Sequence, residues 1–196
     1  MEDVEPDAAT VFEQSAEEFQ ARVRAVDPQA WGRPTPCAEW DVRALVNHVV
    51  GEQRWVVPLM GGRTVAEVGD ALDGDLLGSA PQETADAAAK EAVAALSEPG
   101  ALERTVHLSF GDFSGADYAW QLAADHVVHS WDLAVAAGGD PDLDRDLVTR
   151  MARWWEQWED AYRGAGAVGD RVEVAADASA QDRLLASFGR DPRWGS

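Results

Sequence analysis

The chain has 196 residues and a formal net charge of −20, with 46% hydrophobic and 8% aromatic residues. This composition excludes a disordered chain, and the length suits one globular domain, so we expect residues 1–196 to form a single domain. A surface this acidic repels the phosphate backbone of nucleic acids and anionic membrane surfaces, so we expect binding to neither. The only cysteine, Cys37, excludes an internal disulfide.

No apolar run approaches the roughly 18–20 residues that span a bilayer. The first residues are acidic and lack the basic-then-apolar pattern of a signal peptide. We therefore expect a cytoplasmic protein. The sequence leaves open whether the chain forms a homodimer.

The chain opens with two predicted amphipathic helices. Apolar residues recur at helical spacing among Glu and Gln over about residues 7–26. A stretch with several prolines, residues 28–36, then breaks the pattern. The second helix begins near Glu39 or Asp41, with Asp41 as its N-cap, and we expect it to end before Pro58.

The middle of the chain is less regular. Residues 61–81 are rich in Gly and Asp and predict a loop with one short helix at about 64–72. A third main helix is expected over about 82–96, because alanine favours helix. Residues 99–115 predict a short extended excursion or a hairpin.

The helix predicted over about residues 116–137 is the most informative. Its only charged side chains are three aspartates, it carries two histidines, and Gly138 ends it. A helix that is apolar on nearly every side is central to a core. A fifth helix follows over about 143–162, and its tryptophans at 154–158 either line a site, form an oligomer interface or pack between helices. Together with a short helix near 181–188, this pattern predicts an all-α bundle.

Asp125 and His129 are the first candidate functional residues. They lie four positions apart on the central helix, about 40° apart around its axis, so their side chains can converge on one point. A carboxylate inside an apolar helix is costly without compensation, and His48 on the second helix supplies a third donor. Zinc, nickel and iron accept this donor set, and open coordination positions are typical of catalytic sites. From spacing alone, a buried Asp–His hydrogen bond explains the pattern equally well.

Four other residues near this group have open roles. Glu52, one turn after His48, is either a proton shuttle or second-shell acceptor or a solvated surface side chain. His126 points about 100° away from Asp125 around the helix, which favours packing or hydrogen bonding over ligation. Cys37 is either a reactive thiol at a helix start or a small residue holding the turn. Asp132 either orients a ligand or caps a neighbouring element.

Two segments carry a resemblance to a known family. Residues 35–51, TPCAEWDVRALVNHVVG, resemble the "TPC-x-x-W-x-V-x-x-L-x-x-H" signature of the DinB-like metalloprotein superfamily. More narrowly, they resemble the metal-binding domain of mycothiol-dependent maleylpyruvate isomerases. Residues 125–134, DHVVHSWDLA, resemble the second signature of that group, and residues 181–185 and 189–192 are typical of its C-terminal end.

The resemblance implies a DinB-like four-helix bundle with a long crossover, to which the residue pattern adds peripheral short helices and a short extended excursion or hairpin. It implies one divalent metal ion held by His48, Asp125 and His129, with zinc as the first choice and nickel or iron as alternatives. The chemistry would be thiol transfer or isomerisation of a small-molecule substrate, with a low-molecular-weight thiol such as mycothiol as co-substrate. Glu52 is then the first candidate for a catalytic base. A non-catalytic metal-binding or ligand-sensing bundle is the alternative.

Overall fold

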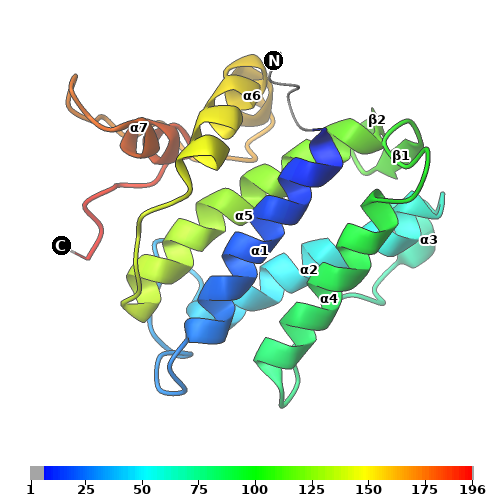
Figure 1. Cartoon of the computed structure of the whole chain (residues 1–196), viewed down its shortest axis with the longest axis horizontal. Coiled ribbons are helices and arrows are strands. Elements are labelled where there is room, and N and C mark those ends of the chain that lie inside the picture. Colours follow the sequence, from blue (N-terminus) through cyan, green and yellow to red (C-terminus); the bar gives the residue numbers. More distant parts are fainter. Residues whose placement is uncertain (1–6, 196) are drawn as a thin grey trace, which may run out of the picture.

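The computed structural model describes residues 7–195, and its main body is a bundle of four helices (Figure 1). The bundle consists of α1 (Ala8–Ala25), α2 (Val42–Met60), α4 (Pro81–Leu96) and α5 (Gly115–Ala137). Helix α1 packs against α4 and α5, and α2 packs against the same two helices, so the four close into a ring. This arrangement confirms the predicted all-α bundle.

Two small elements lie in the connections between bundle helices. The long crossover from α2 to α4 contains the short helix α3 (Val65–Val68). The connection from α4 to α5 contains an antiparallel hairpin of β1 (Thr105–Leu108) and β2 (Gly111–Ser114). Val65 and Leu108 belong to the same apolar cluster, so the crossover and the hairpin meet at one end of the bundle.

The last two helices form a separate layer beside α5. They are α6 (Arg145–Gly164) and α7 (Ala180–Ser187), and Figure 1 shows them on the side of α5 away from α2 and α4. Aromatic rings join α6 to the end of α7 and to α5. The ring centroids of Trp155 and Phe188 lie 3.9 Å apart, and those of Trp154 and Trp120 on α5 lie 6.5 Å apart. Trp154 and Trp155 therefore pack between helices, and both also line a hollow at the site described below.

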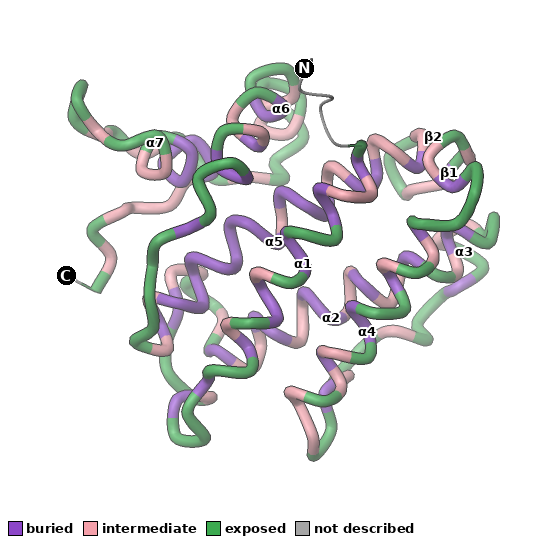
Figure 2. The backbone as a smooth tube through the Cα atoms, viewed as in Figure 1, coloured by how far each residue is buried: buried purple, intermediate pink, exposed green. Residues whose placement is uncertain are grey.

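Helix α5 is the centre of the molecule, and Figure 2 shows it buried along most of its length. Ser114 and Asp117 form a capping box at its start, and Gly138 ends it in the left-handed region at φ 79°. The capped helix carries two histidines and one aspartate among its buried residues. No helix within residues 7–195, α5 included, is long and apolar enough to cross a membrane.

The predicted end of α2 was wrong, because the helix continues past Pro58 to Met60. A proline costs a helix one backbone hydrogen bond and crowds the preceding turn. Here Pro58 lies in the last turn, and the N–H of Gly61 still donates to the carbonyl of Val57 at 3.0 Å. Leu59 and Met60 are buried, and this burial of apolar surface offsets the local cost.

Gly115, the first residue of α5, permits a close approach that generates a stability prediction. A Cβ added there would overlap the backbone carbonyl oxygen of Ala101. Backbone would have to move, so Gly115→Ala should lower the free energy of unfolding by about 1–3 kcal/mol in urea titrations. The control is Gly164→Ala at the end of α6, where an added Cβ meets no atom within 4 Å. Equal stability of the two variants would contradict this packing argument.

Candidate metal centre

The turn before α2 places the side chains of Cys37 and Trp40 at the site. The Thr35 hydroxyl donates to the carbonyl of Trp40 at 2.9 Å, and the N–H of Trp40 donates to the carbonyl of Cys37 at 2.8 Å. Asp41 then caps α2 by accepting from the N–H of Ala44 at 2.8 Å. The segment therefore folds as a closed turn that leads directly into a capped helix.

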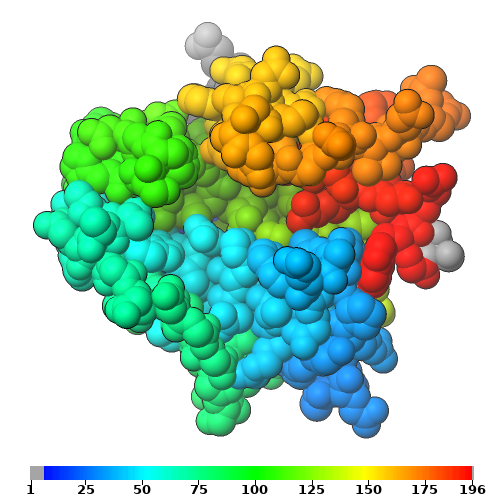
Figure 3. All heavy atoms as spheres, turned by 180° about the vertical axis from the view of Figure 1, so that it is seen from behind, coloured from blue at the N-terminus to red at the C-terminus, as the bar shows by residue number. Residues whose placement is uncertain are grey.

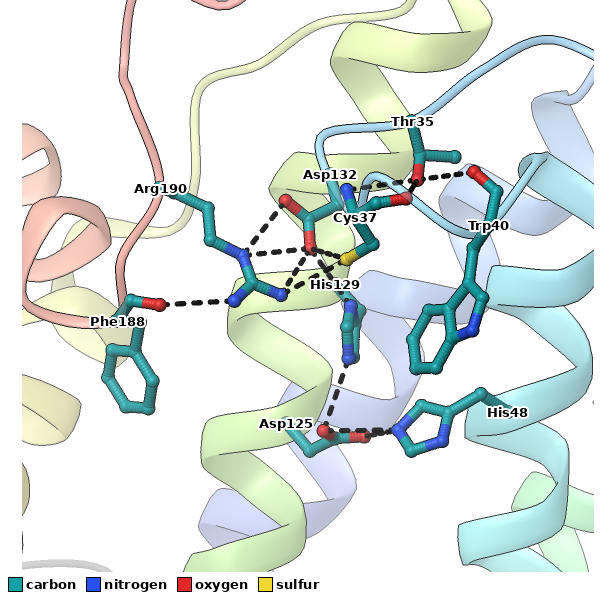
Figure 4. A network of polar contacts seen from close by, with 9 residues as sticks. All are labelled: Thr35, Cys37, Trp40, His48, Asp125, His129, Asp132, Phe188 and Arg190. Carbon is teal, nitrogen blue, oxygen red and sulfur yellow. Dashed lines mark hydrogen bonds and ion pairs between the residues drawn. The ribbon is translucent and has the colours of Figure 1, made fainter. Parts of the chain in front are cut away.

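Three side chains from two helices meet beside this turn (Figure 4). Nε2 of His48 on α2 and Nε2 of His129 on α5 lie 3.4 Å and 3.3 Å from Oδ1 of Asp125. One donor atom from each residue can be chosen so that all three lie within 4.8 Å of one another. Helix α2 packs directly against α5, as expected if His48 is to join Asp125 and His129.

The separations and the donor types fit a metal ion. Tetrahedral ligands at about 2.0–2.1 Å from a zinc-like ion lie about 3.3–3.4 Å from each other. The two imidazole–carboxylate separations have these values. One carboxylate and two imidazoles form a set that zinc, nickel and iron accept. The residues present therefore suit a three-ligand metal site.

The electrostatics of the three groups also favour a cation. Burial alone would raise the pKa of Asp125, but His129 and His48 hold it well below its usual range. Burial alone would lower the pKa of His129, but the charge of Asp125 and the hydrogen bonds of Asp125 and Asp132 hold it well above its usual range. Asp125 therefore carries a negative charge beside the two imidazoles, and a bound cation would compensate it.

A second carboxylate orients His129 from the other side. Oδ2 of Asp132 lies 2.9 Å from Nδ1 of His129, and Arg190 donates to Asp132 from Nη2 at 3.0 Å and from Nε at 3.3 Å. Burial would raise the pKa of Asp132, but His129 and Arg190 lower it. An ionised carboxylate only accepts, so the Nδ1 of His129 carries its proton. This contact fixes the ring with Nε2 facing Asp125.

Cys37, His129 and Asp132 form a second group with suitable ligand atoms. Nη2 of Arg190 lies 3.2 Å from the sulfur of Cys37 and 3.0 Å from Oδ2 of Asp132. The guanidinium therefore already supplies the positive charge that this group attracts. The group of His48, Asp125 and His129 therefore fits a metal ion better. Cys37 is half-buried and contacts Arg190, the residue that also holds Asp132.

His126 lies outside the cluster, as its angular position on α5 predicts. Its Nδ1 lies 3.1 Å from the Ser15 hydroxyl, and its Nε2 lies 3.0 Å from Nε2 of Gln53. Burial lowers the pKa of His126 to about 4, so the ring is neutral at pH 7. His126 therefore bridges α1 and α2 inside the core.

Two hollows flank Asp125, in a groove that Figure 3 shows with α5 as its floor. The aromatic hollow, about 470 Å³, is lined by Trp40, Trp154, Trp155, Tyr162, Phe188 and Arg190, among others. The hairpin hollow, about 310 Å³, is lined by Glu52, Trp55, Val65, Leu108, Phe110 and Tyr118, among others. Gln121 and Asp125 line both hollows, so the three-residue cluster lies where they meet.

Comparison with known families identifies the group. The mycothiol maleylpyruvate isomerase N-terminal domain family matches residues 12–134. The chain belongs to this family. Two uncharacterised proteins of Mycobacterium tuberculosis, from strains CDC 1551 and H37Rv, are each 31% identical to it over 189 residues, 95% of this chain and 100% of theirs.

Solved structures of the same family share the fold. They are crystal structures of the mycothiol-dependent maleylpyruvate isomerase and of a point mutant, with TM-scores of 0.57 and 0.60. Each is 15% identical, and the similarity covers 84% of this chain and 72% of the other chain. The helical DinB-like fold predicted from the two signatures is therefore confirmed.

Sequence analysis assigned no role to two residues of the site, Trp40 and Arg190. The ring centroid of Trp40 lies 4.7 Å from that of His48 and 5.8 Å from that of His129, so the indole covers both imidazoles. Trp40 lies inside the range matched by the family, but Arg190 lies beyond it. Both residues lie in the segments that carry the family resemblance, and this was the one feature of the sequence that could have pointed to them.

The contact of Arg190 with fully buried Asp132 generates a second stability prediction. Arg190→Gln removes the cation from a carboxylate that water does not reach, so it should lower the free energy of unfolding by about 2–4 kcal/mol. Arg193→Gln is the matched control, because its ion pair with Asp191 is exposed and screened by solvent, so its loss should cost much less. Urea titrations measure both. An equal cost for the two variants would contradict the role given to Arg190.

Proposed function

We propose that this protein is a metal-dependent enzyme with a low-molecular-weight thiol as co-substrate. The enzyme either transfers this thiol onto a small molecule or uses it to isomerise a small molecule. The observation that carries the proposal is the cluster of His48, Asp125 and His129 at the junction of two hollows. Mycothiol is the proposed co-substrate, because the names of the family and of the two solved structures refer to it.

The exposure of the cluster favours an enzyme over a non-catalytic metal-binding or ligand-sensing bundle. The side chains of His48 and Asp125 are 29% and 27% exposed, and both line the aromatic hollow. A site closed by four protein ligands would suit a structural ion. Three ligands beside a hollow leave coordination positions for substrate, which supports turnover.

His48, Asp125 and His129 would hold the ion, with zinc as the first choice and nickel or iron as alternatives. When bound, such an ion lowers the pKa of a thiol that ligates it and so supplies a thiolate nucleophile. Asp132 keeps His129 in the tautomer that ligation needs, and Arg190 balances the charge of Asp132.

The aromatic hollow would receive the thiol. Its rings offer flat apolar faces, and its polar groups converge near the cluster, which is the usual composition of a small-molecule site. Trp40 packs against the two imidazoles and would help hold them in place.

Glu52 is the proposed proton acceptor. It lines the hairpin hollow together with Asp125. Burial and the negative charge of Asp125 raise the pKa of Glu52, which brings it closer to the neutral range where a general base works best. In this role Glu52 would take up a proton at the cluster, on the hairpin-hollow side of Asp125, and return it to the product.

Metal retention tests the ligand assignment. The purified protein should contain about one equivalent of divalent metal, and His129→Ala should lose it while keeping the circular dichroism of the bundle, because the apolar core does not depend on the ion. The control is His107→Ala on the hairpin, where His107 pairs with Asp112 outside the cluster. Full metal occupancy in His129→Ala would overturn the assignment, and if that variant unfolds because buried Asp132 loses a partner, His48→Ala takes its place in the same measurement.

Thiol-dependent consumption of electrophiles tests the activity and the role of Glu52. The metal-loaded protein should accelerate conjugation or isomerisation only when a low-molecular-weight thiol such as mycothiol is present. Glu52→Gln should retain the metal and lose about 10²–10⁴-fold in rate, the usual contribution of a general base. Glu83→Gln, exposed at the start of α4, is the control. Undiminished turnover in Glu52→Gln would refute this role.

A further inference from the structure

The only cysteine of the chain, Cys37, lines the hollow that would receive the thiol, yet the proposed function gives it no part. Cys37 is half-buried in the closed turn before α2. A thiol bound in the aromatic hollow would therefore have its own sulfur close to a sulfur of the protein. Two sulfur atoms in the same hollow can be joined by a disulfide bond.

Two charged side chains hold the sulfur of Cys37 in place (Figure 4). The thiol donates to Oδ2 of Asp132 at 3.4 Å, and Nη2 of Arg190 donates to the sulfur at 3.2 Å. Arg190 also lines the aromatic hollow and donates to the carbonyl of Phe188. The sulfur is thus kept in one position beside the space that a ligand would occupy, and such positioning favours a covalent step.

An unpaired donor indicates that the aromatic hollow takes a ligand. Trp155 lines the hollow and is 2% exposed, and its indole N–H has no hydrogen-bond partner within residues 7–195. An indole N–H can only donate, and a buried donor without an acceptor costs about 1–3 kcal/mol. A bound molecule with a hydroxyl or carbonyl oxygen would supply this acceptor.

We propose that Cys37 forms a mixed disulfide with the low-molecular-weight thiol of the aromatic hollow, and that this modification blocks the hollow. The co-reactant is the oxidised form of that thiol, its symmetrical disulfide. The sulfur of Cys37 attacks one sulfur of this disulfide, a new S–S bond forms, and the original S–S bond breaks. The other half leaves as a thiol with the proton that Cys37 gives up, so Cys37 is oxidised and the leaving half is reduced. This inference rests on the proposed function and adds a redox regulation to its thiol site.

The mixed disulfide closes the site according to the redox state of the thiol. The attached half occupies the space that a free thiol would need, and the S–H donation to Asp132 is lost. Excess reduced thiol reverses the exchange. The hollow is therefore open when the thiol is reduced and closed when most of it has become disulfide.

The rate of exchange tests whether the hollow guides the modification. The purified protein and a peptide of residues 35–41, which has the same cysteine without the hollow, are treated with mycothiol disulfide and followed by intact mass. A half-buried thiol reacts more slowly than the peptide if nothing holds the disulfide beside it. Binding raises the local concentration of the disulfide, so at about 0.1 mM the protein should gain its single adduct at least about tenfold faster than the peptide. An equal or slower rate in the protein overturns the proposal.

Two controls separate binding in the hollow from a sulfur that is merely reactive. S-methyl mycothiol, which cannot exchange, should slow the protein toward the rate of the peptide and leave the peptide unaffected. Val168→Trp, which fills part of the aromatic hollow, should also slow the exchange, whereas Val65→Trp in the hairpin hollow should not. If circular dichroism shows that Val168→Trp unfolds, the competitor alone decides. Exchange that the competitor does not slow would overturn the proposal.

Isothermal titration calorimetry distinguishes failure of this inference from failure of the proposed function. S-methyl mycothiol should bind the unmodified protein, lose at least about tenfold in affinity once the adduct has formed, and regain it after reduction. Unchanged affinity in the adduct would overturn the blocking role of Cys37 alone. No binding to the unmodified protein would instead remove the thiol site, and with it both the inference and the proposed function.

Discussion

Two carboxylates on the most buried helix constrain the rest of the structure. Asp125 and Asp132 both lie on α5, and the side chain of Asp132 is completely buried. A charge in such a place must be compensated by groups from neighbouring elements. Asp132 is compensated by His129 and by Arg190 of the C-terminal segment, and Asp125 by His129 and by His48 of α2. The two carboxylates therefore require α2 and the C-terminal segment to lie against α5.

These contacts form an alternating line of charge along one side of α5. From the C-terminal segment to α2, a guanidinium, a carboxylate, an imidazole, a carboxylate and a second imidazole follow one another (Figure 4). The line places Asp125, His129 and Asp132 on one seam, so most of the remaining surface of α5 can pack into apolar clusters with α1, α6 and the hairpin. It also turns two imidazole Nε2 atoms and one carboxylate toward the groove, where a ligand can reach them.

The helices were predictable because their signals are local. Caps such as Asp41 and the Gly138 stop act within one turn, and the apolar periodicity of α1 and α4 lies within each segment. The end of α2 was not predictable by the same rule, because the burial of Leu59 and Met60 outweighs the local cost of Pro58. That burial depends on neighbours that α2 acquires only when the bundle assembles.

The sequence by itself determined that Asp125 and His129 converge, since residues four apart on a helix share one side whatever surrounds them. The sequence also offered His48 on the second helix as a third donor, and the tertiary structure brought it within 3.4 Å of Asp125, 77 positions away. Only the tertiary structure decided the role of Arg190, which lies 58 positions from Asp132 and fills the second group of potential ligands with its own charge. The two hollows, too, exist only where α2, α5, α6 and the hairpin meet. Helix geometry is set by short-range bonds, whereas these arrangements depend on which distant segments pack together, and no local pattern specifies that packing.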